Sequence, residues 1–257
     1  MRTLLIAIAL CLPTLSFAKE YWETVSLGHS TVDLFILEPD DARITVIMLP
    51  GGTWSLGKND PVSQRPTGRN FLVRSAPLFY DHSITTIVMG KPSGAPDLGN
   101  GKARMSRQHA QDILAVAEFA NRKFGRPVWL IGTSRGTQSA VTAKLHDEGH
   151  LIEGLVLSSS ILGSGKSDIS ILDLDLKKIT VPVFISHHSK DECHITNPKD
   201  VALLVQSLVN SRAVEVQLIS SGHSPSKRSC GPAHWHGYIN AEQETVDGIA
   251  NWIKSRN

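Results

Sequence analysis

The sequence lacks long basic runs, internal repeats, low-complexity tracts and apolar runs long enough to span a bilayer. Its formal net charge is only +2 over 257 residues. Proteins that bind nucleic acid or anionic membrane surfaces concentrate basic charge, so we expect neither partner. The hydrophobic fraction of 41% is ordinary for a globular protein of this length. With no linker visible, one domain is the simplest prediction.

The N-terminus has the features of a secretory signal peptide. Met1-Arg2 supplies a positive start, an apolar run covers 4–12, and Ser16-Phe-Ala18 resembles a small-x-small cleavage site. We predict a signal peptide over residues 1–18, cleaved after Ala18, and a periplasmic or secreted protein. No stable membrane association is expected after cleavage. Lipidation at Cys11 and a buried N-terminal helix remain as alternatives, although Cys11 follows Leu10 rather than a small residue.

Cysteine is also scarce, with three residues in the whole chain. If Cys11 leaves with the signal peptide, Cys193 and Cys230 remain. An isolated pair in an exported protein predicts one disulfide, and the alternative is two free buried thiols.

The mature part, residues 19–257, alternates apolar strands with amphipathic helices. We expect helices near 70–81, from Ser106, after Asn197-Pro198, and from Asn240, where Gln243 would complete a capping box. Such alternation indicates an α/β protein with a mostly parallel, doubly wound sheet and helices on both faces. The expected strands cover 21–27, 31–37, 44–49, 84–89, 127–131, 151–157, 181–186 and 214–219.

One of these strands runs into Gly132-Thr-Ser134-Arg-Gly136, and small residues that suit a helix follow. A buried strand, a sharp turn with one serine and a helix form a nucleophile elbow. Glycines flank the serine because side chains there would collide at the turn. The helix N-terminus would also favour negative charge developing beside Ser134. The alternative is a tight strand-to-helix turn with no chemistry.

A catalytic serine needs a histidine base, and that histidine needs a carboxylate. Ligands of a doubly wound sheet gather where strands end, so both groups are expected in the loops that follow strands. Asp191, after the strand at 181–186, is the expected acid, with Glu192 next and Asp173 and Asp175 as further alternatives.

Three histidines follow the last strand, at 223, 234 and 236. His236 is the expected base because it lies just ahead of the final helix, which anchors it near the strand ends. His223 lies in a looser stretch rich in serine, glycine and proline, and it and His234 remain as alternatives.

An oxyanion hole needs two aimed donors. The backbone N–H of Arg135 supplies one from the elbow. The other is expected after the strand at 44–49, where Gly52 is the first choice and Thr53 the second. Trp54 either lines the substrate pocket or packs on the surface.

The order Ser134, Asp191, His236 and the Leu-Pro-Gly-Gly stretch at 49–52 resemble the alpha/beta-hydrolase superfamily over nearly the whole mature chain. The separation of His236 from Trp252 is similar to the usual distance from the catalytic histidine to the end of the last helix. With Cys230 and His236-Gly-Tyr, the sequence resembles exported bacterial hydrolases related to dienelactone-hydrolase-like esterases. Pro50 stands where many members have histidine, although related enzymes carry Pro-Gly there.

The resemblance implies a serine hydrolase that cleaves a small carboxylic ester through an acyl-enzyme and needs no cofactor. A peptidase or amidase with the same triad and a non-catalytic binding protein are the alternatives. Residues 158–180 are too few for a large lid domain. A disulfide between Cys193 and Cys230 would tie the loop of the acid to the loop of the base. The histidines and cysteines near 187–194 and 223–236 show no zinc-ligand spacing, so no metal site is predicted.

Overall fold

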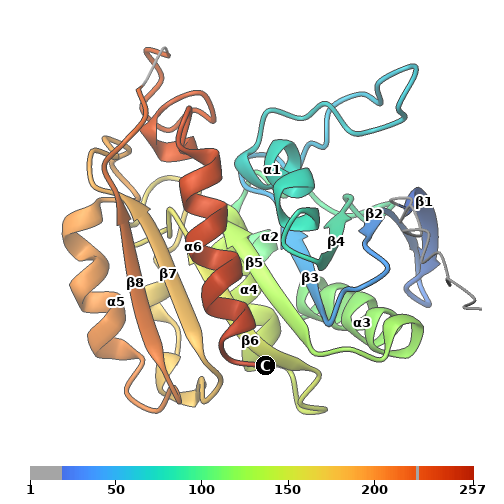
Figure 1. The fold of residues 1–257 in the computed structure, drawn as a ribbon. Coiled ribbons are helices and arrows are strands. Elements are labelled where there is room, and N and C mark those ends of the chain that lie inside the picture. The colour runs from blue at the N-terminus through green and yellow to red at the C-terminus, as the bar shows by residue number, and fades with distance from the viewer. Residues whose placement is uncertain (1–18, 224–225) are drawn as a thin grey trace, which may run out of the picture.

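The computed structural model describes residues 19–223 and 226–257. An eight-stranded sheet, in the order β1-β2-β4-β3-β5-β6-β7-β8, forms its centre (Figure 1). β1 pairs antiparallel with β2, β2 antiparallel with β4, and every later pair is parallel. The strands are β1 (Lys19–Ser26), β2 (Thr31–Glu38), β3 (Ile44–Leu49), β4 (Ile84–Met89), β5 (Val128–Thr133), β6 (Ile152–Ser158), β7 (Val183–His188) and β8 (Val214–Ile219).

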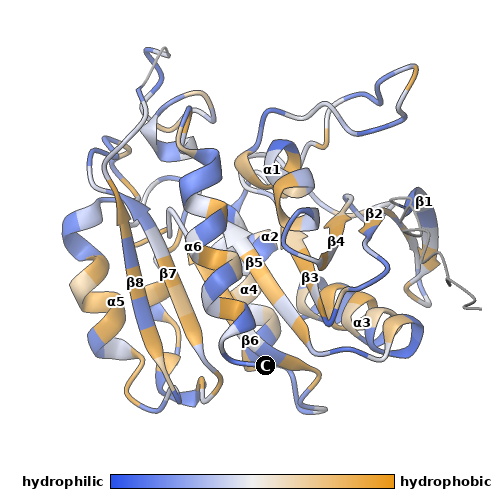
Figure 2. Ribbon diagram, in the orientation of Figure 1, coloured by the Kyte–Doolittle hydropathy of each residue, from blue (hydrophilic) through white to orange (hydrophobic). Residues whose placement is uncertain are grey.

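The strands β3, β4, β5 and β7 are buried along their whole length. Their continuous apolar runs fit a strand that is covered on both faces, which is the normal state of a parallel sheet. The edge strand β8 is only partly buried, and Figure 2 shows the apolar colour concentrated on the interior strands. The predicted α/β architecture is therefore correct.

Helices cover the two faces of the sheet unequally. α3 (Arg107–Phe124), α4 (Arg135–Leu145) and α5 (Val201–Ser207) contribute to one apolar cluster. α1 (Phe71–Tyr80) and α6 (Glu242–Lys254) pack on the opposite face and against each other (Figure 1). The expected cap of α3 is confirmed, because Ser106 accepts a hydrogen bond from the His109 N–H at 3.2 Å.

The predicted start of the last helix is wrong. α6 begins at Glu242 after Ala241, and no side chain caps it. Asn240 has a φ of +60° and therefore lies outside the helix. Its amide group contacts His223 instead, so the expected capping box with Gln243 does not form. The turn that brings residues 236–241 back onto the sheet determines where this helix begins, and the local capping pattern at Asn240 does not.

The connection between β6 and β7 carries only two 3-10 turns, η1 (Ile171–Asp173) and η2 (Leu176–Lys178). This agrees with the expectation that no large lid domain is inserted there. The short helix α2 (Gly101–Arg104) precedes α3. Within the described ranges, none of the helices has the length and apolar character needed to cross a membrane. The predicted signal peptide, with Cys11, lies outside the described residues.

Candidate active site

Ser134 lies between β5 and α4 in a sharp turn with a φ of +54°, a region that few residues other than glycine adopt. Its N–H donates to the carbonyl of Ser158 at 2.9 Å, which fixes the turn to β6. A Cβ at Gly132 would lie 2.3 Å from the Gly136 oxygen, and one at Gly136 would lie 1.9 Å from the Leu49 oxygen. The expected collisions are thus confirmed, and both glycines are required by the elbow.

His236 and Asp191 contact each other directly. The His236 Nδ1 lies 2.9 Å from Oδ2 of Asp191, and both side chains are almost fully buried. With Nδ1–H donating to the carboxylate, Nε2 of a neutral imidazole is an acceptor. His236 and Ser134 line one cavity, so the imidazole and the serine border the same space.

The Asp191 carboxylate is held in its ionised form. Burial raises the pKa of this group, but hydrogen bonds from His236, the Cys193 N–H at 2.9 Å and the Thr196 hydroxyl at 2.8 Å bring the pKa below its ordinary value. An ionised carboxylate accepts from Nδ1–H and stabilises an imidazolium. The site therefore has the electrostatics that a histidine base requires.

The other acid and base candidates lie elsewhere. His223 is exposed and contacts Asn240. His234 is buried beside Glu192, with 3.5 Å between Nε2 and the carboxylate. Asp173 and Asp175 are exposed on the connection between β6 and β7. Two candidate pairs therefore meet, but only in the Asp191–His236 pair is the contact a hydrogen bond and does the histidine line the cavity that Ser134 lines.

The cavity has a volume of about 460 Å³. It contains the expected oxyanion residues Gly52 and Arg135, together with Thr53 and Cys230. Its other lining residues are Gly51, Ser55, Gly57, Thr67, Gly68, Arg69, Asn70, Phe71, Thr133, Ile195, Pro232 and Gly237. Segments from the ends of β3, β5 and β7 and from the turn before α6 thus meet around one space.

Backbone donors are available on two sides of this cavity. Arg135 is the first residue of α4, where an N–H has no acceptor within the helix. Neither Gly52 N–H nor Thr53 N–H donates to an acceptor in the described part of the chain. Gly51 must be glycine because a Cβ would lie 2.6 Å from the Thr133 oxygen, so the loop after β3 packs directly on the elbow.

Trp54 occupies neither of the two expected positions. Its side chain is 2% exposed, does not line the cavity, and donates Nε1–H to the Met89 carbonyl at 2.7 Å. The turn from Gly51, in which the Trp54 N–H donates to the Gly51 oxygen, directs this residue into the core. Trp54 is therefore the internal support of the loop after β3.

Three residues that hold His236 have no individual sequence signal. The Thr196 hydroxyl lies 3.1 Å from Nδ1 of His236 while it donates to Asp191. Ser159 Oγ donates to the His236 carbonyl at 2.9 Å, and the buried Tyr238 hydroxyl donates to the Ser186 carbonyl at 2.6 Å. In the sequence, the His236-Gly-Tyr stretch is the one visible hint of this turn. The structure explains its glycine, because a Cβ at Gly237 would lie 2.0 Å from the Pro232 oxygen.

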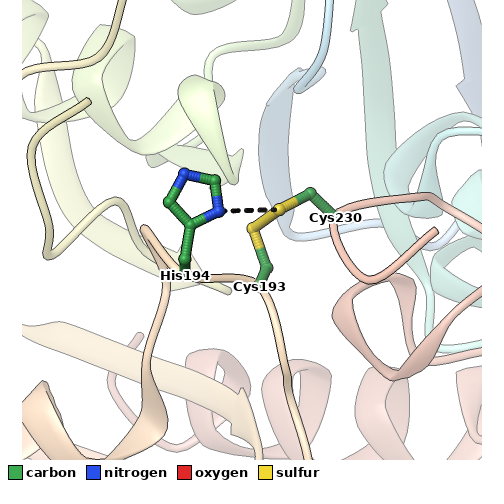
Figure 3. A group of neighbouring side chains, drawn as sticks. All are labelled: Cys193, His194 and Cys230. Carbon is green, nitrogen blue, oxygen red and sulfur yellow. Dashed lines mark hydrogen bonds between the residues drawn. A yellow bond between two sulfur atoms is a disulfide. The ribbon is translucent and has the colours of Figure 1, made fainter. Parts of the chain in front are cut away.

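The structure pairs Cys193 with Cys230 in a disulfide with a Cα–Cα distance of 4.6 Å. Figure 3 shows the His194 ring directed at this bridge, with 3.9 Å between Nδ1 and Sγ of Cys230. These three side chains form the one cluster with metal-ligand geometry among the described residues. The thiolates that a soft metal requires are absent while the sulfurs are bonded to each other.

No protein-family profile matches the sequence, and a search of curated proteins gave no significant match. Solved structures do match over nearly the whole chain. A cold-adapted esterase from an Arctic intertidal metagenomic library gives a TM-score of 0.64 at 16% identity, covering 95% of this chain and 96% of that one.

A Pyrococcus furiosus esterase gives a TM-score of 0.65 at 13% identity, covering 93% of each chain. A dienelactone hydrolase from Anabaena variabilis gives 0.61 at 14% identity, covering 93% of this chain and 98% of that one. The chain therefore has the α/β-hydrolase fold.

Proposed function

We propose that the protein is a serine hydrolase that cleaves a carboxylic ester through a Ser134–His236–Asp191 triad. One observation supports this more than any other: Ser134 on a strained elbow lines the same cavity as His236, whose Nδ1 bonds to a buried carboxylate. Esterases with the same fold are consistent with this chemistry.

In the proposed mechanism, Nε2 of His236 accepts the proton of the Ser134 hydroxyl as the oxygen attacks the ester carbonyl. The imidazolium that forms is stabilised by Asp191. The N–H of Arg135 and a second N–H from the loop after β3, Gly52 or Thr53, hold the oxyanion. His236 then protonates the leaving alcohol, and a water molecule, activated by the same histidine, hydrolyses the acyl-enzyme.

The proposed substrates are small, soluble esters. The cavity of about 460 Å³ is of ordinary size for a small-molecule site. The 3-10 turns between β6 and β7 do not build a separate lid. A peptidase or amidase would use the same triad and is the second candidate, while a non-catalytic binding protein would not need the Asp191–His236 pair.

A substrate panel tests this proposal. We expect the purified protein to hydrolyse p-nitrophenyl acetate and other short acyl esters much faster than matched anilides and peptides. Ser134→Ala is expected to lower kcat by at least about 10³-fold, because without the nucleophile only substrate binding and oxyanion stabilisation can still accelerate the reaction. Ester hydrolysis that persists in Ser134→Ala would contradict the proposed triad, and faster cleavage of anilides would favour an amidase.

We also propose that residues 19–257 form one exported domain. The basic start and apolar run before Ala18 suit secretion. The disulfide between Cys193 and Cys230 suits an oxidising compartment such as the periplasm or the cell exterior.

A further inference from the structure

Arg104, at the end of α2, is a cation buried behind the loop that follows β3. Its side chain is 0% exposed. None of the ion pairs in the described ranges includes it, although Asp168 and Asp97 act on its charge through space. Arginine is almost never fully buried unless it is paired, because desolvation of the charge is costly. Arg104 therefore must have other partners that compensate for the absence of a bonded carboxylate.

Those partners are backbone carbonyls of one loop and its surroundings. The guanidinium donates from Nη1 to the Pro50 oxygen at 2.8 Å and from Nη2 to the Gly52 oxygen at 3.0 Å. Nε donates to the Leu98 oxygen at 2.6 Å. Its Cζ also lies 4.5 Å from the centroid of the Trp54 ring, and the Trp54 indole is anchored on the Met89 carbonyl. Arg104 thus fixes two peptide groups of the loop that contains Gly52 and Thr53.

The orientation of these peptide groups bears on the oxyanion hole. In a trans peptide the C=O and the following N–H point in opposite directions. Because the Arg104 guanidinium binds the Gly52 oxygen, the Thr53 N–H points away from that guanidinium. The same peptide is polarised by a charged donor on its carbonyl, which makes its N–H a stronger donor. The Gly51–Gly52 peptide is fixed by a different bond, because the Trp54 N–H donates to the Gly51 oxygen, so the Gly52 N–H points away from the Trp54 N–H.

Arg104 also contacts the other side of the site. Its Nη1 lies 3.4 Å from the hydroxyl of Ser139 on α4, the helix that begins with Arg135. The Arg135 guanidinium is held by Asp168, with 2.6 Å between Nε and Oδ1. Arg104 therefore lies between the loop that supplies one oxyanion donor and the helix that supplies the other.

We propose that Arg104 is the positioning residue of the oxyanion hole, holding the loop at 50–53 so that its free N–H donors face the carbonyl oxygen bound at Ser134. This inference rests on the proposed function. Arg104 does not touch the substrate; it acts through the Pro50 and Gly52 carbonyls. A hydrophobic residue would fill the same space at a lower desolvation cost but could not hold these carbonyls.

The test compares Arg104→Lys and Arg104→Met with the wild type, using p-nitrophenyl acetate as substrate and phenylboronic acid as an inhibitor that forms a tetrahedral adduct with Ser134. The matched control is Arg126→Met, since Arg126 bonds to Thr85 near the start of β4, far along the sheet from the site. Rates are expressed per folded molecule, with folding measured by circular dichroism.

Losing one aimed oxyanion donor lowers kcat by about 10²–10³-fold. We therefore expect kcat to fall about 100-fold in Arg104→Met and about 10-fold in Arg104→Lys, because lysine keeps the charge but not the fork that spans two carbonyls. KM should change by less than about twofold, because a hole aimed at the transition state contributes little to ground-state binding. Affinity for the boronic acid should fall in the same ratio as kcat/KM, and Arg126→Met should keep wild-type kinetics.

A folded Arg104→Met protein with kcat within about threefold of wild type would overturn this inference. If Arg104→Met does not fold, Arg104→Lys is the deciding variant. A folded Arg104→Lys protein with unchanged kcat and unchanged affinity for the boronic acid would then overturn the inference. Wild-type hydrolysis separates the two proposals. If the wild type is inactive, the proposed function fails and this inference fails with it; if the wild type is active and the Arg104 variants are equally active, only the inference fails.

Discussion

At the scale of single residues, neighbouring groups determine the orientation and the tautomer of the His236 imidazole. Asp191 bonds to Nδ1, Ser159 holds the backbone carbonyl, and Thr196 donates to the carboxylate. These contacts fix the ring orientation and the tautomer with Nε2 as acceptor. By this geometry Asp191 orients the imidazole through a hydrogen bond, in addition to placing a negative charge near it. Substitutions at the adjacent acids Asp191 and Glu192 separate these two effects.

Asp191→Asn is expected to lower kcat for ester hydrolysis by about 10⁴-fold, because an amide favours the wrong imidazole tautomer and cannot stabilise the imidazolium. Glu192→Gln is the matched control. Glu192 is the next residue and is exposed beside His234, so activity should stay within about twofold of wild type. Equal losses in the two variants, measured by steady-state kinetics, would contradict the assigned role of Asp191.

Among the buried histidines outside the proposed triad, His187 and His109 have a strongly lowered pKa and are therefore neutral. Burial lowers the pKa of His187 to about 4 and that of His109 to about 3. The unfolded chain has a histidine pKa of about 6.5 and binds protons first as pH falls, so stability is lost below about pH 6.5. We expect urea denaturation to show about 1–2 kcal/mol lower stability per histidine at pH 5 than at pH 7.

His187→Gln should reduce this acid loss, since a glutamine oxygen can still accept the Ser160 N–H that now bonds to Nε2 of His187 at 2.7 Å. An identical drop in stability between pH 7 and pH 5 in wild type and variant would show that His187 is not one of the responsible groups.

At the scale of elements, the elbow depends on how closely β3, β5 and α4 approach. Gly136 lies against the carbonyl of Leu49 at the end of β3, and Gly51 lies against the carbonyl of Thr133 at the end of β5. Side chains at these points would push Ser134 and the loop at 50–53 apart. The precision of the site is therefore a property of backbone packing at the strand ends.

Gly136→Ala is expected to lower the free energy of unfolding by about 2–3 kcal/mol and to abolish most ester hydrolysis, because the new methyl group collides with the Leu49 oxygen. Gly149→Ala is the control. A Cβ there is 3.7 Å from its nearest neighbour, Leu151, so stability should change by less than about 0.5 kcal/mol. Equal melting temperatures for both variants would rule out the close contact at Gly136.

At the scale of the whole molecule, residues far apart in sequence form the site because parallel strands end at one edge of the sheet. Ser134 follows β5, Asp191 follows β7, and His236 precedes α6. The disulfide between Cys193 and Cys230 joins the last two of these segments across 37 residues. It therefore restrains the loop of the proposed acid relative to the loop of the proposed base.

Removing this bridge with the double variant Cys193→Ser, Cys230→Ser is expected to destabilise the fold by about 4 kcal/mol in a chain-entropy treatment of a 37-residue loop. Ester hydrolysis should fall as the loops separate. Melting curves and kinetics check both effects. Dithiothreitol should lower the melting temperature and activity of the wild type toward those of the variant, and should leave the variant unchanged. Unchanged melting and kinetics of the wild type in reductant would refute this role.

Much of the fold was predictable because long apolar runs and helical stripes are strong local signals. The strand at 44–49 and the elbow at Ser134 appear where the sequence places them. Element ends were less predictable, as Asn240 shows: its cap pattern is local, whereas its position is set by the turn that carries His236.

The supports of the site were not predictable for a different reason. Thr196 and Arg104 act through contacts with distant segments, and nothing in their own neighbourhoods marks them. Trp54 was misjudged because its direction depends on the turn at Gly51 and on a carbonyl of β4. Such roles become visible only when the strand ends are assembled.

In the proposed mechanism, Ser134 is a nucleophile activated by His236. The most direct measurement is labelling of the folded wild-type protein by a fluorophosphonate probe, with the modified residue identified by peptide mass spectrometry. Ser134 is expected to be the labelled residue, and Ser134→Ala is expected to show no labelling. Absence of labelling in folded wild type, or labelling that persists in Ser134→Ala, would contradict the proposed role of Ser134.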